Sequence, residues 1–371
     1  MRDILISGYY GFKNSGDDAL LLAIIRDLKK YKEDVSLAVL SNSPKETSEI
    51  YKVKAVNRMN PFSIIINLLK SRLLISGGGT LIQDGTSTKS LIYYLGIIKL
   101  AHFLGKKVML YANGIGPLRE EHRKMTADIL NKVDMITLRD ENSLEELKNL
   151  GVDKPKIILT ADPAFNLECK NSERGKEILK KYGIKPEDKT VLISVRNWKK
   201  ISPDFCGEIA KTADYLAETY GYKIVFLPMQ YSKDCEISEN VQKLMKNESV
   251  CLEEYLSIDD VLSVIKDSEL CIGMRLHSLI YSAGNAVPVI GLVYDVKIAG
   301  FMDYINQKYY TDAQKVKFED LKKMSDECIN NREKICSDII KDGVVLKQKA
   351  QSNAKYAIEL LNKKERGKAL K

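Results

Sequence analysis

The sequence predicts an α/β protein with two facing Rossmann-like, doubly wound domains and a helical C-terminal extension. Short β-branched runs alternate with longer segments of helical period up to about residue 310, which is the pattern of parallel sheets covered by helices on both faces. A polar stretch at 162–189, with Pro163 and Pro186, interrupts the alternation and predicts a domain junction. The length of 371 residues and the hydrophobic content of 44% suffice for two cores.

The predicted strands form two sets, one for each domain. The first set lies near residues 2–7, 35–40, 53–56, 72–76, 107–111, 134–138 and 157–160. The second set lies near 190–195, 222–228, 250–252, 269–273 and 288–293. Beyond residue 315 the sequence is helical and highly charged, with a long helix expected at about 346–364. We therefore expect an N-terminal domain at 1–165, a C-terminal domain at 166–315 and a helical extension at 316–371.

Composition limits the class of function. The formal net charge of +8 favours anionic partners, such as phosphorylated ligands or acidic lipid surfaces. If the charge is considered by itself, a lysine-rich surface that only keeps the protein soluble is the better explanation. No helix-turn-helix, zinc-finger or aromatic RNP pattern supports nucleic-acid binding. The seven cysteines are dispersed, without a C-x-x-C pair or a histidine at metal-ligand spacing, so we expect reduced thiols and no metal site.

The N-terminus and the apolar runs predict a cytoplasmic protein. MRDILISGYYGF leads directly into a strand and lacks the features of a secretory signal. The two longest apolar stretches, 61–76 and 90–105, are interrupted by charged residues or histidine, and both are too short to cross a bilayer.

Ligands of open parallel sheets bind beyond the carboxyl ends of the strands, so the residues that follow the strands are the candidate site residues. After the first strand, Asp17 and its neighbour open an amphipathic helix, where a carboxylate either stabilises the positive helix end or acts in catalysis. After the fourth strand, Gly77, Gly78 and Gly79 allow either close approach of a ligand to the backbone or tight helix packing.

Arginines follow two further strands. Arg139 comes directly after MITL in the first domain, and Arg196 follows VLISV in the second. Trp198, the only tryptophan, lies two residues later. Its flat face can stack on a sugar, unless it is a core residue.

The stretch CIGMRLHSLIYSAGNAVPVIGLVYDVK, residues 271–297, places three cations at helix starts. Arg275 and His277 lie at the start of one predicted helix, and Lys297 lies in the first turn of the next. A helix N-terminus repels a cation by roughly 0.3–1 kcal/mol, and a bound anion reverses that sign. We expect uncompensated positive charge here that binds a phosphate or a carboxylate. Because His277 lies beside Arg275 after a strand, we favour a functional role for it. We interpret His102 and His122 as structural.

Seven segments form an ordered set. They are GYYGFKNSGDDAL, LLISGGGTLIQD, ANGIGP, ITLRDENS, ISVRNW, MRLHSLIYSAGNAVPVIGL and YDVK. This set resembles the polysaccharide pyruvyl transferases, most closely the CsaB type of Gram-positive cell-wall assembly, over roughly residues 1–305. The sequence departs from the pattern expected for this family at two positions: Asp18 stands where we expect a family member to have Glu, and Asn113 where we expect Gln.

The resemblance implies a GT-B-like fold, with the sugar acceptor on the N-terminal domain and phosphoenolpyruvate on the C-terminal domain. It implies transfer of the pyruvyl unit of phosphoenolpyruvate, the co-substrate, onto a sugar as a cyclic ketal, with no cofactor. In the CsaB type the implied acceptor is a β-linked N-acetylmannosamine on a lipid-diphosphate disaccharide, bridged at O4 and O6. The pyruvylated secondary cell wall polysaccharide then anchors S-layer proteins. The net positive charge suits an enzyme that visits such an acceptor, and we expect peripheral, salt-sensitive association with the inner face of the cell membrane.

By this resemblance, Arg139, His277 and Lys297 match donor-site positions. We expect Arg139 and Lys297 to bind the phosphate and carboxylate of phosphoenolpyruvate, with Arg275 in support, and His277 to move protons. Asp17 is expected to be a base on the acceptor side. The further candidate substrate contacts are Gly77, Gly78, Gly79, Arg196 and Trp198.

Two other classes of function remain open. A GT-B glycosyltransferase with a nucleotide-sugar donor also needs Arg and Lys at a helix start to hold its diphosphate. A non-catalytic module for anionic glycans or lipid headgroups would use the basic surface and the charged C-terminal helix. The glycosyltransferase would be stabilised against heat by UDP or GDP sugars. The binding module would bind a pyruvylated glycan without consuming any donor.

Overall fold

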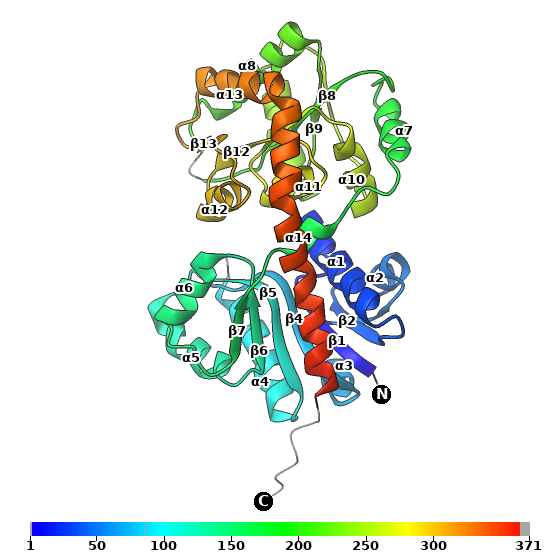
Figure 1. Cartoon of the computed structure of the whole chain (residues 1–371), viewed down its shortest axis with the longest axis vertical. Coiled ribbons are helices and arrows are strands. Elements are labelled where there is room, and N and C mark those ends of the chain that lie inside the picture. The colour runs from blue at the N-terminus through cyan, green and yellow to red at the C-terminus, as the bar shows by residue number, and fades with distance from the viewer. Residues whose placement is uncertain (1, 86, 200, 364–371) are drawn as a thin grey trace, which may run out of the picture. The chain divides into compact units, whose positions relative to one another are not determined.

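The computed structural model describes residues 2–85, 87–199 and 201–363. It comprises two compact units (Figure 1). Unit 1 contains Met1–Asn166 and the chain from Leu346 onward, and unit 2 contains Leu167–Val345. The boundary follows the short 3-10 helix η1 (Pro163–Asn166). The segment predicted as a C-terminal extension is helical and is divided between the units, because α14 (Arg332–Asn362) begins in unit 2 and ends in unit 1.

Unit 1 is built on a parallel sheet of order β3-β2-β1-β4-β5-β6-β7. Its strands are β1 (Arg2–Ser7), β2 (Leu37–Ser41), β3 (Lys54–Asn57), β4 (Ser71–Ile82), β5 (Lys107–Ile115), β6 (Met135–Leu138) and β7 (Lys156–Leu159). Alternate residues of β1 point to opposite faces: Ile4 and Ile6 belong to one apolar cluster and Leu5 to the other. Because both faces are buried, the strands read as continuous apolar runs.

Helices cover both faces of this sheet (Figure 1). They are α1 (Ser15–Tyr31), α2 (Pro44–Tyr51), α3 (Pro61–Leu69), α4 (Thr88–Phe103), α5 (Glu120–Leu130), α6 (Glu141–Asn149) and the last part of α14. On one face, Ala357 and Leu361 of α14 pack in the same apolar cluster as Ile24 of α1. On the other face, α3 and α4 share a cluster through Leu68 and Leu95. The C-terminal helix therefore supplies part of the core of unit 1.

The glycine run lies inside a strand rather than in the predicted loop, because β4 continues through it. Gly78 and Gly79 have φ of +57° and +75°, which favour glycine strongly. A Cβ on Gly77 would lie 2.8 Å from Oη of Tyr10, and one on Gly78 would lie 2.9 Å from Cβ of Leu20. The glycines thus let β4 pack tightly against Tyr10 and α1, which is the packing role that the sequence left open.

Unit 2 contains a second parallel sheet, of order β10-β9-β8-β11-β12-β13. Its strands are β8 (Thr190–Ser194), β9 (Lys223–Phe226), β10 (Ser249–Cys251), β11 (Leu270–Gly273), β12 (Val289–Val293) and β13 (Tyr310–Asp312). Its helices are α7 (Glu173–Lys181), α8 (Phe205–Tyr220), α9 (Lys233–Gln242), α10 (Ile258–Lys266), α11 (Leu276–Gly284), α12 (Val296–Tyr304), α13 (Phe318–Asn330) and the first part of α14. The edge strand β13 is not predicted, because it has only three residues and none of them is fully buried.

The predicted fold class is confirmed, with two parallel α/β units and a helical C-terminal stretch. Within residues 2–85, 87–199 and 201–363, no helix is both long and apolar enough to cross a membrane. The same residues contain no group of three or more His, Cys, Asp or Glu side chains arranged for a metal ion.

Candidate active site

The predicted site residues divide between the two units, and each lies in a strand or in the loop or first helical turn that follows one. Unit 1 contains Asp17, Gly77, Gly78, Gly79 and Arg139. Unit 2 contains Arg196, Trp198, Arg275, His277 and Lys297. The carboxyl edge of each sheet therefore carries its own group of polar side chains, as expected for open parallel sheets.

In unit 1, Arg139 follows β6 and is buried. Its Nη1 donates to Oδ2 of Asp162 at 2.6 Å, and its Nη2 donates to Oγ1 of Thr80 at 3.0 Å. Burial alone would lower the pKa of Arg139, but the carboxylates of Asp162, Asp140 and Asp17 raise this pKa above its ordinary value. Carboxylates within unit 1 thus compensate the positive charge of Arg139.

Asp17 lies half-buried in the first turn of α1. The N-cap of this helix is Asn14, whose Oδ1 accepts from the backbone N–H groups of Gly16 and Asp17 at 3.1 and 3.4 Å. Capping therefore does not require the Asp17 side chain. A Cβ on Gly79 would lie 3.5 Å from Oδ1 of Asp17, so this carboxylate lies beside the glycine run of β4.

A histidine and a carboxylate pair at the same edge of unit 1. His122, in the first turn of α5, has its Nδ1 2.6 Å from Oδ2 of Asp84, a buried residue just beyond β4. Asp84 also accepts from the backbone N–H of Arg119 at 3.1 and 3.2 Å. Burial would raise the pKa of the Asp84 carboxyl, but the hydrogen bonds from His122 and Arg119 lower it below its ordinary value. The structure thus gives His122 a fixed position that its charged surroundings in the sequence do not indicate.

In unit 2, Arg275 follows β11 and is the N-cap residue of α11. Its Nε donates to Oδ2 of Asp234 at 2.9 Å, and its Nη2 donates to Oδ1 at 2.5 Å and to Oε1 of Gln230 at 3.3 Å. Asp234 is completely buried and also accepts from the backbone N–H groups of Met229 and Gln230. This bidentate contact with Asp234 fixes the plane of the Arg275 guanidinium. Nη1 makes no hydrogen bond with any residue that the structure describes.

His277 lies half-buried in the first turn of α11, with its ring 5.8 Å from the ring of Tyr281. In the described part of the chain, no side chain caps α11, and its first turn contains no acidic residue. The neighbouring helix α12 differs, because Oδ1 of Asp295 accepts from the backbone N–H of Lys297 at 3.1 Å. The start of α11 therefore retains the partial positive charge of a helix end beside His277 and Arg275.

Tyr294 connects the remaining candidates of unit 2. Nη1 of Arg196 donates to its hydroxyl at 2.8 Å, and Trp198 meets its ring edge-on at a centroid distance of 5.6 Å. Nζ of Lys297 lies 5.8 Å from the centroid of the same ring. Sequence reasoning missed Tyr294, whose only signal is its position directly after β12. Trp198 is half-buried in this cluster, so it is not a core residue.

The expectation of uncompensated positive charge at these helix starts is wrong. Arg275 pairs with Asp234, and Nζ of Lys297 lies 3.3 Å from Oδ2 of Asp295. The two pairs differ in strength, because Asp234 is buried whereas Lys297 and Asp295 are each more than a third exposed and water screens such a pair. The positive charge that a ligand can use is thus Nη1 of Arg275, the start of α11 and the weakly held Lys297.

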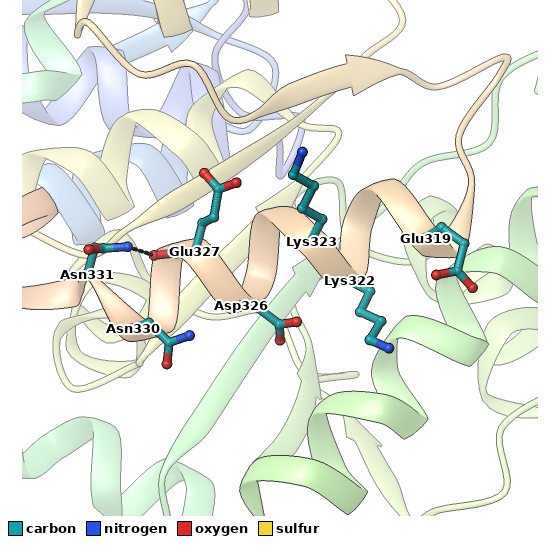
Figure 2. Close-up of a pocket in the computed structure, with 7 residues that line it drawn as sticks. All are labelled: Glu319, Lys322, Lys323, Asp326, Glu327, Asn330 and Asn331. Carbon is teal, nitrogen blue, oxygen red and sulfur yellow. Dashed lines mark hydrogen bonds between the residues drawn. The ribbon is translucent and has the colours of Figure 1, made fainter.

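A concave surface of about 450 Å³ lies elsewhere in unit 2, along α13 (Figure 2). It is lined by Glu319, Lys322, Lys323, Asp326, Glu327, Asn330 and Asn331. Figure 2 shows these side chains leaving the helix in different directions. Asp326 accepts from the hydroxyls of Tyr215 and Tyr220 at 2.8 and 2.7 Å, and Glu327 pairs with Lys308 at 3.2 Å. These carboxylates are engaged within unit 2, so the surface is not a candidate active site.

Two parallel α/β units with polar groups at their sheet edges define a protein of the GT-B fold class. Among solved structures, Staphylococcus aureus MnaA with UDP has a TM-score of 0.66 and 12% identity, with 97% of this chain and 98% of that chain covered. Anabaena Alr3699/HepE with UDP-glucose has a TM-score of 0.66 and 11% identity, with 97% and 99% covered. At these identities the likeness shows the fold alone.

Sequence comparison then gives the family. Residues 14–296 match the model of the polysaccharide pyruvyl transferases, and the chain belongs to this family. The amylovoran biosynthesis protein AmsJ of Erwinia amylovora is 22% identical over 360 residues, with 81% of this chain and 85% of that protein covered. The family and this relative make the protein a transferase of polysaccharide biosynthesis.

Proposed function

We propose that this protein transfers the pyruvyl group of phosphoenolpyruvate onto a sugar as a cyclic ketal and releases phosphate. Membership of the polysaccharide pyruvyl transferase family supports the reaction class. The observation that carries the donor site is the start of α11. There, Arg275 is clamped by buried Asp234 and keeps Nη1 available, while His277 lies in an uncapped first turn.

The donor carries a carboxylate and a phosphate, and unit 2 offers suitable groups for both. Nη1 of Arg275 and the N–H groups at the start of α11 suit one anion. Lys297, which pairs with the partly exposed Asp295 and lies over the Tyr294 ring, suits the other, because a dianionic ligand competes well against a screened surface pair. The assignment of Arg139 to the donor stays a prediction.

The reaction balances with two sugar hydroxyls and no cofactor. His277 donates a proton to the methylene carbon of phosphoenolpyruvate, which becomes the methyl group. One hydroxyl oxygen bonds to C2, the bond between C2 and the phosphate oxygen breaks, and the second hydroxyl closes the ring. Of the two hydroxyl protons, one replaces the proton that His277 gave, and the other leaves with the phosphate. In this scheme Asp17 is the base on the acceptor side.

We propose a lipid-linked acceptor of the CsaB type, namely β-N-acetylmannosamine on a lipid-diphosphate disaccharide, bridged at O4 and O6. The product would be a secondary cell wall polysaccharide that anchors S-layer proteins. The ordered set of sequence segments given above supports this acceptor, whereas the relation to AmsJ, a protein of amylovoran biosynthesis, supports only the role in polysaccharide biosynthesis. We place this activity at the cytoplasmic face of the membrane.

The test is phosphate release from phosphoenolpyruvate with and without a β-N-acetylmannosaminide acceptor, with mass spectrometry of the sugar. We expect release only with acceptor, and a product heavier by the pyruvyl unit. Thermal stabilisation by UDP or GDP sugars, with none by phosphoenolpyruvate, would instead support a nucleotide-sugar glycosyltransferase and contradict the proposal.

A further inference from the structure

The outer face of α3 is apolar, although the outer face of a surface helix is normally polar. The exposed side chains are Phe62, Ile65, Ile66 and Leu69 on the helix and Met59 two residues before its first residue, with exposed fractions between 37% and 78%. We call these five residues the α3 apolar surface. The inner face of the helix includes Asn67, which is buried and donates to the backbone carbonyl of Ser63 at 2.7 Å. The polarity of α3 is thus partly inverted.

The end of α4 lies next to the end of α3. Nζ of Lys106 donates to the backbone carbonyl of Leu69 at 3.0 Å, which joins the turn after α4 to the last residue of α3. Phe103, at the end of α4, is 83% exposed. An exposed aromatic side chain therefore lies three residues before the lysine that contacts the end of α3.

Charge is strongly segregated along the sequence that contains these helices, although Arg58 and Lys107 of this segment are buried. Residues 51–119 contain ten Lys and Arg but only one carboxylate, Asp84, so their formal charge is +9. The rest of the chain, with 48 Lys and Arg and 49 Asp and Glu, has a formal charge of −1. Asp84 is buried and engaged with His122. Lys70, directly after α3, and Lys99 on α4 are exposed.

We propose that the α3 apolar surface, with Lys70 and Lys99, docks onto an anionic lipid bilayer. Exposed Phe, Ile and Leu side chains insert into the boundary between headgroups and acyl chains, while the lysines contact acidic headgroups. A second copy of the chain fits poorly as occupant, because a symmetric pairing brings two segments of charge +9 together. The proposal deepens the proposed function, since a lipid-linked acceptor lies in a membrane.

The first experiment measures co-sedimentation of the full chain with vesicles of phosphatidylglycerol and phosphatidylcholine, without phosphoenolpyruvate or acceptor. We expect the double variant Phe62→Ser with Ile66→Ser to bind at least about tenfold more weakly. The matched control is Val344→Ser with Val345→Ser, two exposed apolar positions of α14, which we expect to bind within about twofold of the wild type. Far-UV circular dichroism checks that each variant is folded.

The second experiment tests the charge. Lys70→Glu with Lys99→Glu is expected to weaken binding to these vesicles at least about tenfold, and added salt to weaken wild-type binding. Lys180→Glu with Lys181→Glu, at exposed positions of α7, changes the net charge equally and should weaken binding much less.

Three outcomes overturn the proposal. They are absence of wild-type binding even at low salt, equal binding by the α3 variant and its control, and a dimer by light scattering that the α3 variant dissociates. Turnover with a soluble acceptor, measured on the same preparations, separates this proposal from the proposed function. Turnover without vesicle binding rejects only the docking surface, and vesicle binding without turnover rejects only the enzymatic activity.

Discussion

The two units place an arginine at the same edge of similar parallel sheets but treat its charge differently. Arg139 in unit 1 is buried, and three carboxylates act on it. Arg275 in unit 2 has one carboxylate partner and keeps Nη1 without a described hydrogen bond, and Lys297 is held only at the surface. The position after a strand thus predicts where a cation lies, whereas burial and counter-charge decide whether a ligand can use it.

The largest expected effect separates chemistry from binding in unit 2. His277→Ala should lower kcat by roughly 10²–10⁴-fold, because a positioned proton donor contributes about that factor. Binding of phosphoenolpyruvate by calorimetry should change by less than about threefold, and the melting temperature should be nearly unchanged. Turnover equal to that of the wild type would remove His277 from the mechanism.

The second prediction concerns the buried pair of unit 1. Arg139→Ala leaves Asp162 without its buried partner and should destabilise unit 1 by about 3–5 kcal/mol. Denaturation followed by far-UV circular dichroism should show the shift, while fluorescence of Trp198, the only tryptophan, reports on unit 2. Lys297→Ala is the matched control and should leave both transitions nearly in place. An unshifted unfolding curve for Arg139→Ala would contradict the structural role of this pair.

The third prediction uses another buried charge of unit 1. Burial raises the pKa of Asp27 to about 6, although the hydrogen bond from Asn166 and the charge of Lys30 oppose the shift. A raised folded-state pKa stabilises the protein below the unfolded pKa of about 4, and this contribution is lost as the pH rises through about 6. Asp27→Asn should therefore raise the free energy of unfolding by about 2–3 kcal/mol at pH 8, and hardly at pH 4.

Urea unfolding at the two pH values measures this effect. Asp128→Asn, at an exposed position of α5, is the control for loss of a carboxylate. If Asp27→Asn destabilised the protein at pH 8, the carboxylate would instead have to be a favourable partner in the folded state.

The smallest expected effect lies at the surface of unit 2. Lys297→Ala should raise KM for phosphoenolpyruvate by about 5–10-fold, the order of one charge-assisted hydrogen bond, with a smaller change in kcat. Lys180→Ala, on exposed α7, should leave KM unchanged. A fall in kcat without a change in KM would move Lys297 from donor binding to the chemical step.

The sequence could predict the fold class, because the strands are buried on both faces and alternate with helices of a different period. It also could place most of the candidate side chains, because they directly follow strands. It could not reveal Asp234, which lies 41 residues before Arg275 and meets it only through the order of β9, β8 and β11. Tyr294 likewise becomes visible only when Arg196, Trp198 and Lys297 are seen around its ring.

The glycine run shows a limit of a different kind. The run of three glycines predicts that another group lies very close to the backbone of Gly77, Gly78 and Gly79. A ligand and a neighbouring helix both require this absence of side chains. In the structure the nearest side chains are those of Tyr10 and Leu20. The structure shows the packing against Tyr10 and α1, and substrate contact at these glycines stays a prediction, because both roles favour glycine for the same steric reason.

The division of α14 has a consequence for biosynthesis. Residues up to Asn166 emerge from the ribosome first, yet the core of unit 1 also needs Ala354, Ala357, Leu360 and Leu361. At roughly 5–20 residues per second, translation of the intervening segment takes on the order of 10 s or more. For that time the nascent chain exposes apolar surface near α1, so unit 1 completes its folding only after almost the whole chain has been made.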